Sequence, residues 1–206
     1  MASPSSDGGS AENVVPTPVK IVVAGGFGAG KTTMVGSVSE IPPLSTEELM
    51  TQASDGVDDL TGVETKGTTT VALDFGRITI SPHTVLYLFG TPGQDRFWYM
   101  WDELARGAIG TVVLVDTRRL DSSFAAIDFF ERRKIPFVVA VNCFAEADSY
   151  TEDEIRKALA INEGIPMVFI DAREKDQSKL ALIRLVRYAL SRLTEPAAMS
   201  GAGSTA

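Results

Sequence analysis

Short apolar runs recur along the chain, separated by longer stretches in which apolar residues recur with helical spacing. The runs are continuous and mostly rich in β-branched or aromatic residues, which is typical of strands buried on both faces of a parallel sheet. They are Val19–Ala24, Val85–Phe89, Thr111–Val115, Phe137–Val141 and Met167–Ile170. Thr70–Phe75 and Ile78–Ile80 predict an additional strand, an edge hairpin with Val85–Phe89.

Five stretches between these runs predict helices. They run from Gly30 to before Pro42, over Asp95–Arg106, from Asp121 or Ser122 to about Lys134, from Thr151 to about Gly164, and from Asp176 to Leu193. Thr151 and Glu154 have the spacing of a capping box. In the last helix, one apolar face is expected from Leu182, Ile183, Val186 and Leu190. Alternating strands and helices predict a doubly wound α/β fold.

The chain has 206 residues, 44% of them hydrophobic, which suits one α/β domain. Residues 1–17 and 195–206 hold few large apolar side chains, so we expect disordered tails around a domain at 18–194. The formal net charge of −8 gives no electrostatic reason to bind nucleic acid or an anionic membrane.

Cys143 is the single cysteine, which excludes an internal disulfide and favours a reducing cytoplasm. No apolar run approaches the roughly 18–20 residues needed to span a bilayer, and the N-terminus does not have the pattern of a signal peptide. We therefore expect a cytoplasmic protein without direct membrane insertion; if it reaches a membrane, a partner takes it there.

The segment after the first predicted strand matches G-x-x-x-x-G-K-[ST] and opens a predicted helix. It consists of Gly25, Gly26, Phe27, Gly28, Ala29, Gly30, Lys31 and Thr32, followed by Thr33. Glycines let the backbone wrap around a phosphate with its N–H groups pointing inward, and the helix dipole adds positive charge. Lys31 is expected to reach the β- and γ-phosphates, and Thr32 to offer a hydroxyl to Mg²⁺.

Two further motifs are candidates for segments that sense the terminal phosphate. Thr70, in T-x-x-x-D-F, follows a long loop and is expected to place a second hydroxyl on Mg²⁺, with Thr69 as the alternative. In Gly90-Thr91-Pro92-Gly93-Gln94, the N–H of Gly93 is expected to meet the γ-phosphate. Gln94 is then placed to orient an attacking water.

These motifs, in this order and spacing, resemble the Ras superfamily of small GTPases over roughly residues 18–193. The T-P-G-Q form, without an aspartate at its head, looks closer to bacterial MglA-type GTPases and closest to the actinobacterial conservon-type ATP/GTP-binding proteins. The resemblance implies a P-loop NTPase fold of Ras-like type, with a six-stranded mixed sheet of five parallel strands and one antiparallel. It also implies a GTP/GDP cycle with Mg²⁺, a roadblock/LC7-type regulatory partner, and contact with a membrane-associated sensor-kinase complex.

The chain departs from this family in its second switch. Relatives carry D-x-x-G there, with an aspartate that binds Mg²⁺ through water, and Gly90 occupies that position here. We therefore expect Mg²⁺ to be held more weakly. Asp116 ends an apolar strand and is either a metal-site acid or, as we favour, the cap of the following turn.

The base-reading motif also differs. Where relatives have N-K-x-D, this chain has Asn142-Cys143-Phe144-Ala145, so the aspartate that pairs with guanine is missing. Asn142 is expected to tie this loop to the phosphate loop. Glu146 or Asp148 could replace the aspartate if the loop bends, and the N–H of Ala172 corresponds to one that meets guanine O6 in relatives. GTP is the expected ligand, and ATP remains open.

Three features leave alternatives. Relatives of the MglA type can carry an arginine before the switch threonine, and Thr69 stands at that position here. Arg96 or Lys66 could replace the arginine, and slow hydrolysis is expected otherwise.

Residues 40–67 hold seven acidic side chains and one basic one, and they form either a solvated loop or a partner-selecting segment. The run 97–101 cannot all face inward on one helix, so part of it is expected at an interface.

Three functions remain as hypotheses. The first is a switch that hydrolyses GTP slowly, and the second is a scaffold that binds ATP or GTP without hydrolysis. The third, a small-molecule kinase, is disfavoured because no arginine-rich lid is evident in the sequence.

Overall fold

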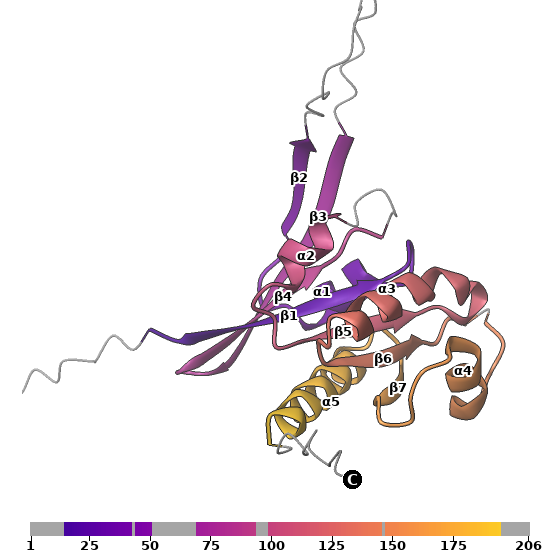
Figure 1. Ribbon diagram of the computed structural model, residues 1–206. Coiled ribbons are helices and arrows are strands. Elements are labelled where there is room, and N and C mark those ends of the chain that lie inside the picture. Colours follow the sequence, from indigo (N-terminus) through magenta and orange to yellow (C-terminus); the bar gives the residue numbers. More distant parts are fainter. Residues whose placement is uncertain (1–14, 43, 51–68, 94–98, 146, 195–206) are drawn as a thin grey trace, which may run out of the picture.

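The computed structural model describes residues 15–42, 44–50, 69–93, 99–145 and 147–194. Within these residues one sheet has the strand order β2-β3-β4-β1-β5-β6-β7 (Figure 1). The strands are β1 (Thr17–Gly25), β2 (Leu44–Met50), β3 (Thr69–Ser81), β4 (Thr84–Gly90), β5 (Gly110–Val115), β6 (Phe137–Asn142) and β7 (Met167–Ile170). Parallel pairing joins β4, β1, β5, β6 and β7, whereas β3 is antiparallel to β4.

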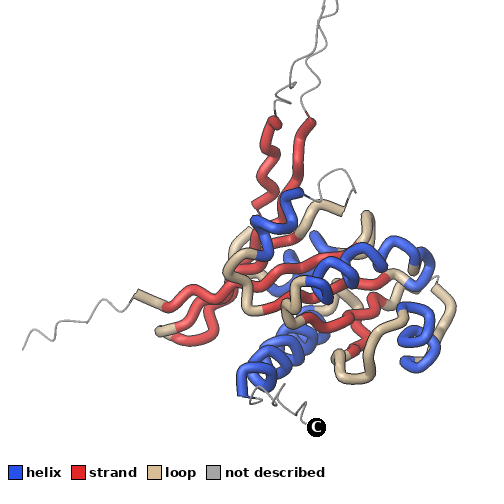
Figure 2. The backbone as a smooth tube through the Cα atoms, viewed as in Figure 1, coloured by secondary structure: helices blue, strands red, loops and turns tan. Residues whose placement is uncertain are grey.

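Helices cover both faces of this sheet (Figure 2). They are α1 (Lys31–Val38), α2 (Tyr99–Ala105), α3 (Asp121–Arg132), α4 (Glu152–Leu159) and α5 (Lys175–Thr194), with a short 3-10 helix η2 at Thr117–Arg119. One buried cluster joins the sheet to α1 and α5, and a second joins it to α2, α3 and α4. Each strand residue packs on one face or the other, which explains why the strand runs are apolar at consecutive positions.

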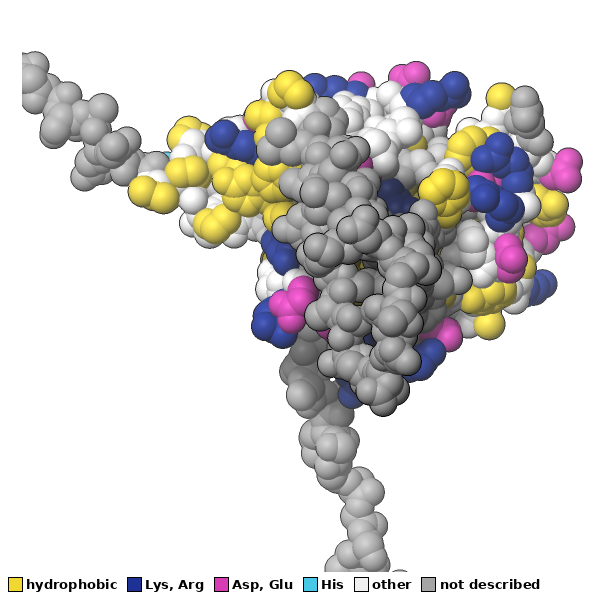
Figure 3. Space-filling model, turned by 90° about the horizontal axis from the view of Figure 1, so that it is seen from above, with side chains coloured by type: hydrophobic (Ala, Val, Ile, Leu, Met, Phe, Trp, Pro, Cys, Tyr) yellow, Lys and Arg dark blue, Asp and Glu magenta, His cyan; other side chains and the backbone are white. Residues whose placement is uncertain are grey.

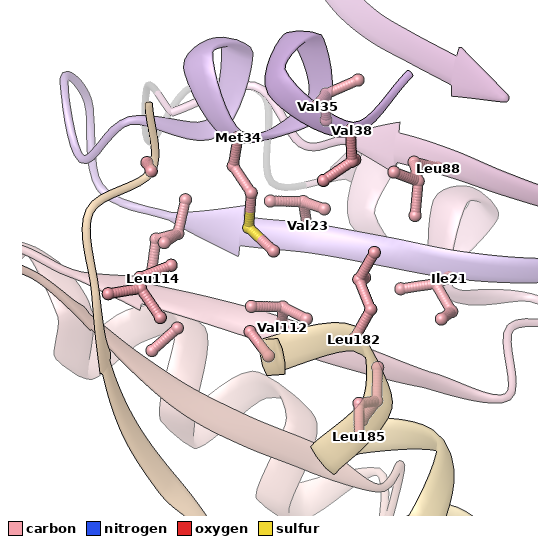
Figure 4. Close-up of a cluster of buried hydrophobic side chains, with 14 of the residues drawn as sticks. Ile21, Val23, Met34, Val35, Val38, Leu88, Val112, Leu114, Leu182 and Leu185 are labelled. Atoms are coloured by element: carbon pink, nitrogen blue, oxygen red, sulfur yellow. The ribbon is translucent and has the colours of Figure 1, made fainter. Parts of the chain in front are cut away.

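The cluster beneath α1 and α5 fixes the start of α1 against the sheet. Figure 4 shows Met34 of α1 and Leu182 of α5 pointing toward Val23 and Val112 on neighbouring strands. All four side chains are at most 5% exposed. Because this packing anchors both β1 and α1, the loop that joins them at residues 25–31 is held at both ends.

The predicted six-stranded mixed sheet, with five parallel strands and one antiparallel, is confirmed. The two segments predicted before the hairpin form one strand, β3, and β2 adds a seventh strand by pairing antiparallel with Thr69–Phe75. Residues 44–50 were expected to belong to the loop at 40–67, and that part of the prediction is wrong. The rest of that loop, residues 51–68, lies outside the described residues.

Two helix predictions need correction. The capping box at Thr151 and Glu154 is confirmed, but α4 ends at Leu159 because Ala160 takes a left-handed conformation with φ 52°. In α5 the buried apolar residues are Ala181, Leu182, Leu185 and Ala189. Ile183 is 48% exposed and Leu190 is 57% exposed. These two residues were wrongly assigned to the buried face of α5.

The first described strand, β1, begins at Thr17, one residue before the predicted start of the domain at 18–194, and the domain boundaries stay a prediction. Tails were predicted at 1–17 and 195–206, and residues 1–14 and 195–206 of them lie outside the described residues. Among the helices that the structure describes, none combines the length and apolarity that a membrane span requires.

Candidate functional site

The phosphate loop takes backbone conformations that require glycine. Gly25, Gly28 and Gly30 have φ of 143°, 75° and 105°, in the region that residues with a Cβ rarely adopt. A Cβ on Gly25 would lie 2.5 Å from the main-chain oxygen of Leu114 on β5. The loop can therefore curl from β1 into α1 only with glycine at these positions.

The ammonium of Lys31 lies inside this loop. It is buried, and Nζ donates to the main-chain oxygens of Gly25 and Gly26 at 2.9 and 2.7 Å. Burial lowers the pKa of Lys31 to about 8, and the charge of Asp74 acts in the opposite direction. A buried cation that is held by neutral carbonyls, with no carboxylate bonded to it among the described residues, is favourably placed to meet an anion.

The N-terminus of α1 adds further donors. Helix geometry leaves the N–H groups of Lys31, Thr32 and Thr33 without acceptors inside the helix, since Met34 makes its first main-chain bond, to Gly30. The side chains of Thr32 and Thr33 are exposed. Together with Lys31, these N–H groups form an anion-binding arrangement of the kind expected at a helix N-terminus.

Asp74 of β3 reaches the start of α1, a contact that the sequence analysis missed. Its Oδ2 accepts a hydrogen bond from Thr32 Oγ1 at 2.7 Å, and the residue is 8% exposed. In the antiparallel register of β3 and β4, Asp74 lies opposite Gly90 on the neighbouring strand. A Cβ on Gly90 would lie 2.9 Å from both Cβ and Oδ2 of Asp74, so the carboxylate fits because Gly90 has no side chain.

This position changes the interpretation of Gly90. Relatives are expected to carry a carboxylate at position 90, and here Asp74 brings one to the same place from the neighbouring strand. The signal in the sequence was the aspartate of T-x-x-x-D-F, whose role becomes visible only once the strand register is known.

A magnesium ion fits the donors at this point. Mg²⁺ is usually held by one or two carboxylates, waters and substrate phosphates. Thr32 and Asp74 supply a hydroxyl and a carboxylate next to the phosphate loop. Elsewhere in the described part of the chain, no group of three or more His, Cys, Asp or Glu side chains could hold a metal ion.

The two switch segments are only partly described. Thr70 lies in β3, paired with Leu49, and its side chain is outside the description, as is all of Gln94. In a strand, Thr70 lies about 13 Å along the chain from Asp74. Sharing a metal ion with Thr32 would therefore require Thr70 to leave its pairing in the sheet.

Gly93 lies directly against the phosphate loop. A Cβ at this position would lie 2.7 Å from Lys31 Nζ and 2.8 Å from the Cα of Phe27. Only glycine fits there without a shift of the neighbouring atoms. The segment after β4 thus reaches the place where a terminal phosphate is expected, although the contact itself remains a prediction.

Asn142 links three loops at the carboxyl ends of the strands. Its Nδ2 donates to the Ala29 main-chain oxygen at 3.0 Å, and its Oδ1 accepts from the Ala172 N–H, also at 3.0 Å. The predicted tie between the base loop and the phosphate loop is therefore present. The Ala172 N–H, which the family resemblance assigns to guanine O6, is used by Asn142 in this structure.

Replacing Asn142 with alanine is expected to lower the free energy of unfolding by about 1–3 kcal/mol, because it leaves two buried main-chain groups without partners. The carbonyl of Ala29 and the N–H of Ala172 belong to residues that are each 1% exposed. Urea unfolding followed by circular dichroism measures this. Cys143→Ala, which changes the adjacent exposed side chain, serves as the control, and equal stability of the two variants would contradict the prediction.

The base loop offers no carboxylate at the expected place. Ala145 is exposed, Asp148 is exposed three residues further on, and Glu146 lies outside the described residues. Asp171 of the neighbouring loop is paired with Arg173 at 2.6 Å, and hydrogen bonds from Arg173 lower its pKa to about 2. Position 145 itself thus carries no carboxylate, and the replacement of the guanine-reading aspartate by Asp148 stays a prediction.

Asp116 caps the turn after β5, as favoured from the sequence. It is 1% exposed, accepts from the N–H of Arg118, and pairs with the Arg118 guanidinium through both oxygens. Burial acts to raise the pKa of Asp116, but the hydrogen bonds and charge of Arg118 outweigh it and lower the pKa. Arg119, the residue after Arg118, donates to the main-chain oxygen of Phe27 in the phosphate loop. The sequence analysis also missed this contact.

The aromatic run at 97–101 divides between surface and core. Trp101 is buried against Phe129 and Phe130 and donates from Nε1 to the Pro92 main-chain oxygen at 3.3 Å, whereas Tyr99 is 56% exposed. Residues 97 and 98, like the candidate arginine at 96 and lysine at 66, lie outside the described residues.

A half-buried aromatic row continues along β3 and β4. The ring centroid of Phe75 lies 5.7 Å from that of Tyr87 and 5.2 Å from that of Phe89. Figure 3 shows hydrophobic side chains gathered on the side of the molecule where this hairpin lies.

Comparison with known proteins adds a family and a fold. The sequence profile of a family described as "Conserved hypothetical ATP binding protein" matches residues 23–192. The uncharacterized protein MJ1339 of Methanocaldococcus jannaschii is 31% identical over 126 residues, which make up 60% of this chain and 69% of that protein.

Among solved structures, the G domain of the T. maritima FeoB iron transporter has a TM-score of 0.57 at 20% identity. The match covers 84% of this chain and 99% of that domain. The cytosolic domain of the same transporter in its apo form has a TM-score of 0.57 at 19% identity, and 64% of its length is covered. These likenesses show a P-loop G-domain fold, whereas the closer resemblance to MglA-type and conservon-type proteins stays a prediction.

Proposed function

Since the chain belongs to the family of conserved hypothetical ATP binding proteins, we propose that it is a nucleotide-operated switch that binds GTP or ATP with Mg²⁺ and hydrolyses it slowly. The observation that carries this proposal is the convergence of Lys31, Gly93 and the Thr32–Asp74 pair on one phosphate loop. A cation, main-chain donors and a metal-binding pair are the parts that phosphoryl transfer requires.

Each residue has a defined task in this proposal. The loop N–H groups and Lys31 bind the β- and γ-phosphates and orient the terminal group. Thr32 and Asp74 hold Mg²⁺, which neutralises charge on the phosphate oxygens when it is bound. Gly93 brings the second switch to the γ-phosphate, so that its position depends on whether that phosphate is present.

Base discrimination is expected to be weak. Guanine selectivity in relatives depends on the aspartate that Ala145 replaces, and losing such a bidentate contact costs about 1–3 kcal/mol of discrimination. The family name points to ATP and the fold neighbours are G domains. We therefore propose that the affinities of this protein for GTP and ATP differ by less than they do in a GTPase that has the guanine-reading aspartate.

The output of the switch is proposed to be a surface for partners. The family resemblance suggests a roadblock/LC7-type regulator, and through it a membrane-associated sensor-kinase complex in bacterial signalling. Tyr99 supports this because it is exposed immediately after the second switch. A regulator that completes the catalytic site would also account for slow hydrolysis by the isolated protein.

Hydrolysis is tested by single-turnover phosphate release from bound GTP and ATP. We expect Gln94→Leu to slow release on the order of tenfold with unchanged nucleotide affinity, because the variant cannot orient water. Asp128→Asn, at an exposed ion pair on α3, is the control. Release at the same rate in both variants would contradict the role of Gln94.

The second candidate is a scaffold that binds nucleotide without a turnover cycle. Ala145 favours it, because the site lacks part of the usual recognition apparatus. Binding with no release above the uncatalysed rate, in wild type and Gln94→Leu alike, would support the scaffold and exclude the switch.

A further inference from the structure

Arg119 contacts the phosphate loop at Phe27, next to the residues whose carbonyls hold Lys31. It ends η2 between β5 and α3, and its Nη2 donates to the main-chain oxygen of Phe27 at 2.7 Å. The two residues are 92 positions apart, so the fold rather than the local sequence brings them together.

The guanidinium lies directly on the loop backbone. A Cβ on Gly28 would lie 2.7 Å from Arg119 Nη2, so a side chain there would displace the guanidinium. The Arg119 side chain is 49% exposed. It is therefore held against the loop while part of it remains open to a ligand in solvent.

One carboxylate, that of Asp116, lies against both arginines beside the loop. Asp116 receives two hydrogen bonds from the Arg118 guanidinium, at 2.9 and 2.8 Å, and lies 3.7 Å from Arg119 Nη2. Two guanidinium groups thus share one buried carboxylate. These three residues, Asp116, Arg118 and Arg119, carry a formal charge of +1 when counted by themselves, and Arg119 is the one that contacts Phe27.

The two arginines have different surroundings. The Arg118 guanidinium lies 3.7 Å over the ring of Phe144 as well as against Asp116, which fixes it to the base loop. Arg119 instead contacts the phosphate loop through one nitrogen. A guanidinium has five N–H donors in a planar fork, so this contact leaves donors for a further acceptor.

We propose that Arg119 is a phosphate-binding residue of this site, whose guanidinium donates to an oxygen of the β- or γ-phosphate of the bound nucleotide. The inference deepens the proposed function and rests on it. Relatives are expected to carry an arginine at the position of Thr69 and a lysine at the position of Cys143. Arg119 would supply a second cation in a site that lacks both. The Phe27 carbonyl and Asp116 hold the guanidinium beside the loop before the ligand arrives.

The test compares Arg119→Ala and Arg119→Lys with Arg132→Ala, whose exposed side chain pairs with Asp128 on α3. Affinities are measured for mant-GTP and mant-ATP, with inorganic tripolyphosphate and the nucleoside monophosphates as competitors. We expect Arg119→Ala to weaken triphosphate and tripolyphosphate binding about tenfold to hundredfold. Monophosphate binding and the melting temperature stay near the wild-type values, and Arg119→Lys restores part of the loss.

Unchanged triphosphate affinity in Arg119→Ala would overturn the inference. So would an equal loss for monophosphates and triphosphates together with a lower melting temperature, since that result identifies Arg119 as a brace for Phe27. Failure of the wild-type protein to bind either triphosphate or tripolyphosphate would instead overturn the proposed function, and this inference with it.

Discussion

Lys31→Ala is expected to lower the affinity for purine triphosphates by at least about a hundredfold, because two charge-assisted hydrogen bonds to phosphate are lost. The ammonium is already inside the loop, held by the carbonyls of Gly25 and Gly26, and burial keeps its pKa near 8. Isothermal titration calorimetry with GTP and ATP measures the loss directly.

The matched control is Lys179→Ala, which removes a half-buried lysine from α5, on the opposite face of the sheet from α3. The control should bind triphosphate as tightly as the wild type. If Lys31→Ala bound as tightly as the control, the loop could not be the phosphate site.

Asp74→Asn is expected to raise the Mg²⁺ concentration needed for tight triphosphate binding about tenfold to hundredfold. The substitution keeps the size of the side chain and the hydrogen bond from Thr32 Oγ1, but it removes the negative charge next to Gly90. Binding without Mg²⁺ should change little, since Asp74 does not contact the ligand in this account.

A Mg²⁺ titration of mant-nucleotide affinity separates these outcomes. Asp128→Asn, at an exposed ion pair on α3, is the control and should follow the wild-type curve. An unchanged Mg²⁺ dependence in Asp74→Asn would mean that the carboxylate only anchors Thr32 and does not replace the aspartate missing at Gly90.

Much of the fold could be predicted because its strands are buried on both faces. Runs such as Phe137–Val141 are apolar at every position, and all of these residues are at most 3% exposed. Helix positions were harder to assign. Ile183 and Leu185 are equally apolar, and only the packing of α5 on the sheet decides that Leu185 is buried while Ile183 is exposed.

The phosphate loop was predictable from the sequence because its chemistry is local. Five of its eight positions lie between one strand and one helix, and glycine is required where the backbone has positive φ. Asp74 and Arg119 were not predictable in the same way. Strand register brings Asp74 to Gly90, and the β5–α3 connection brings Arg119 to Phe27, so neither contact exists in any short segment.

The central claim is that residues 25–32 bind the phosphates of a purine nucleotide. Its most direct test is an equilibrium titration of nucleotide-free wild-type protein with mant-GTP and mant-ATP, with and without Mg²⁺. The account predicts saturable binding of at least one triphosphate at a single site, tighter with Mg²⁺ than without it. No saturable binding of either triphosphate up to about 1 mM would contradict it.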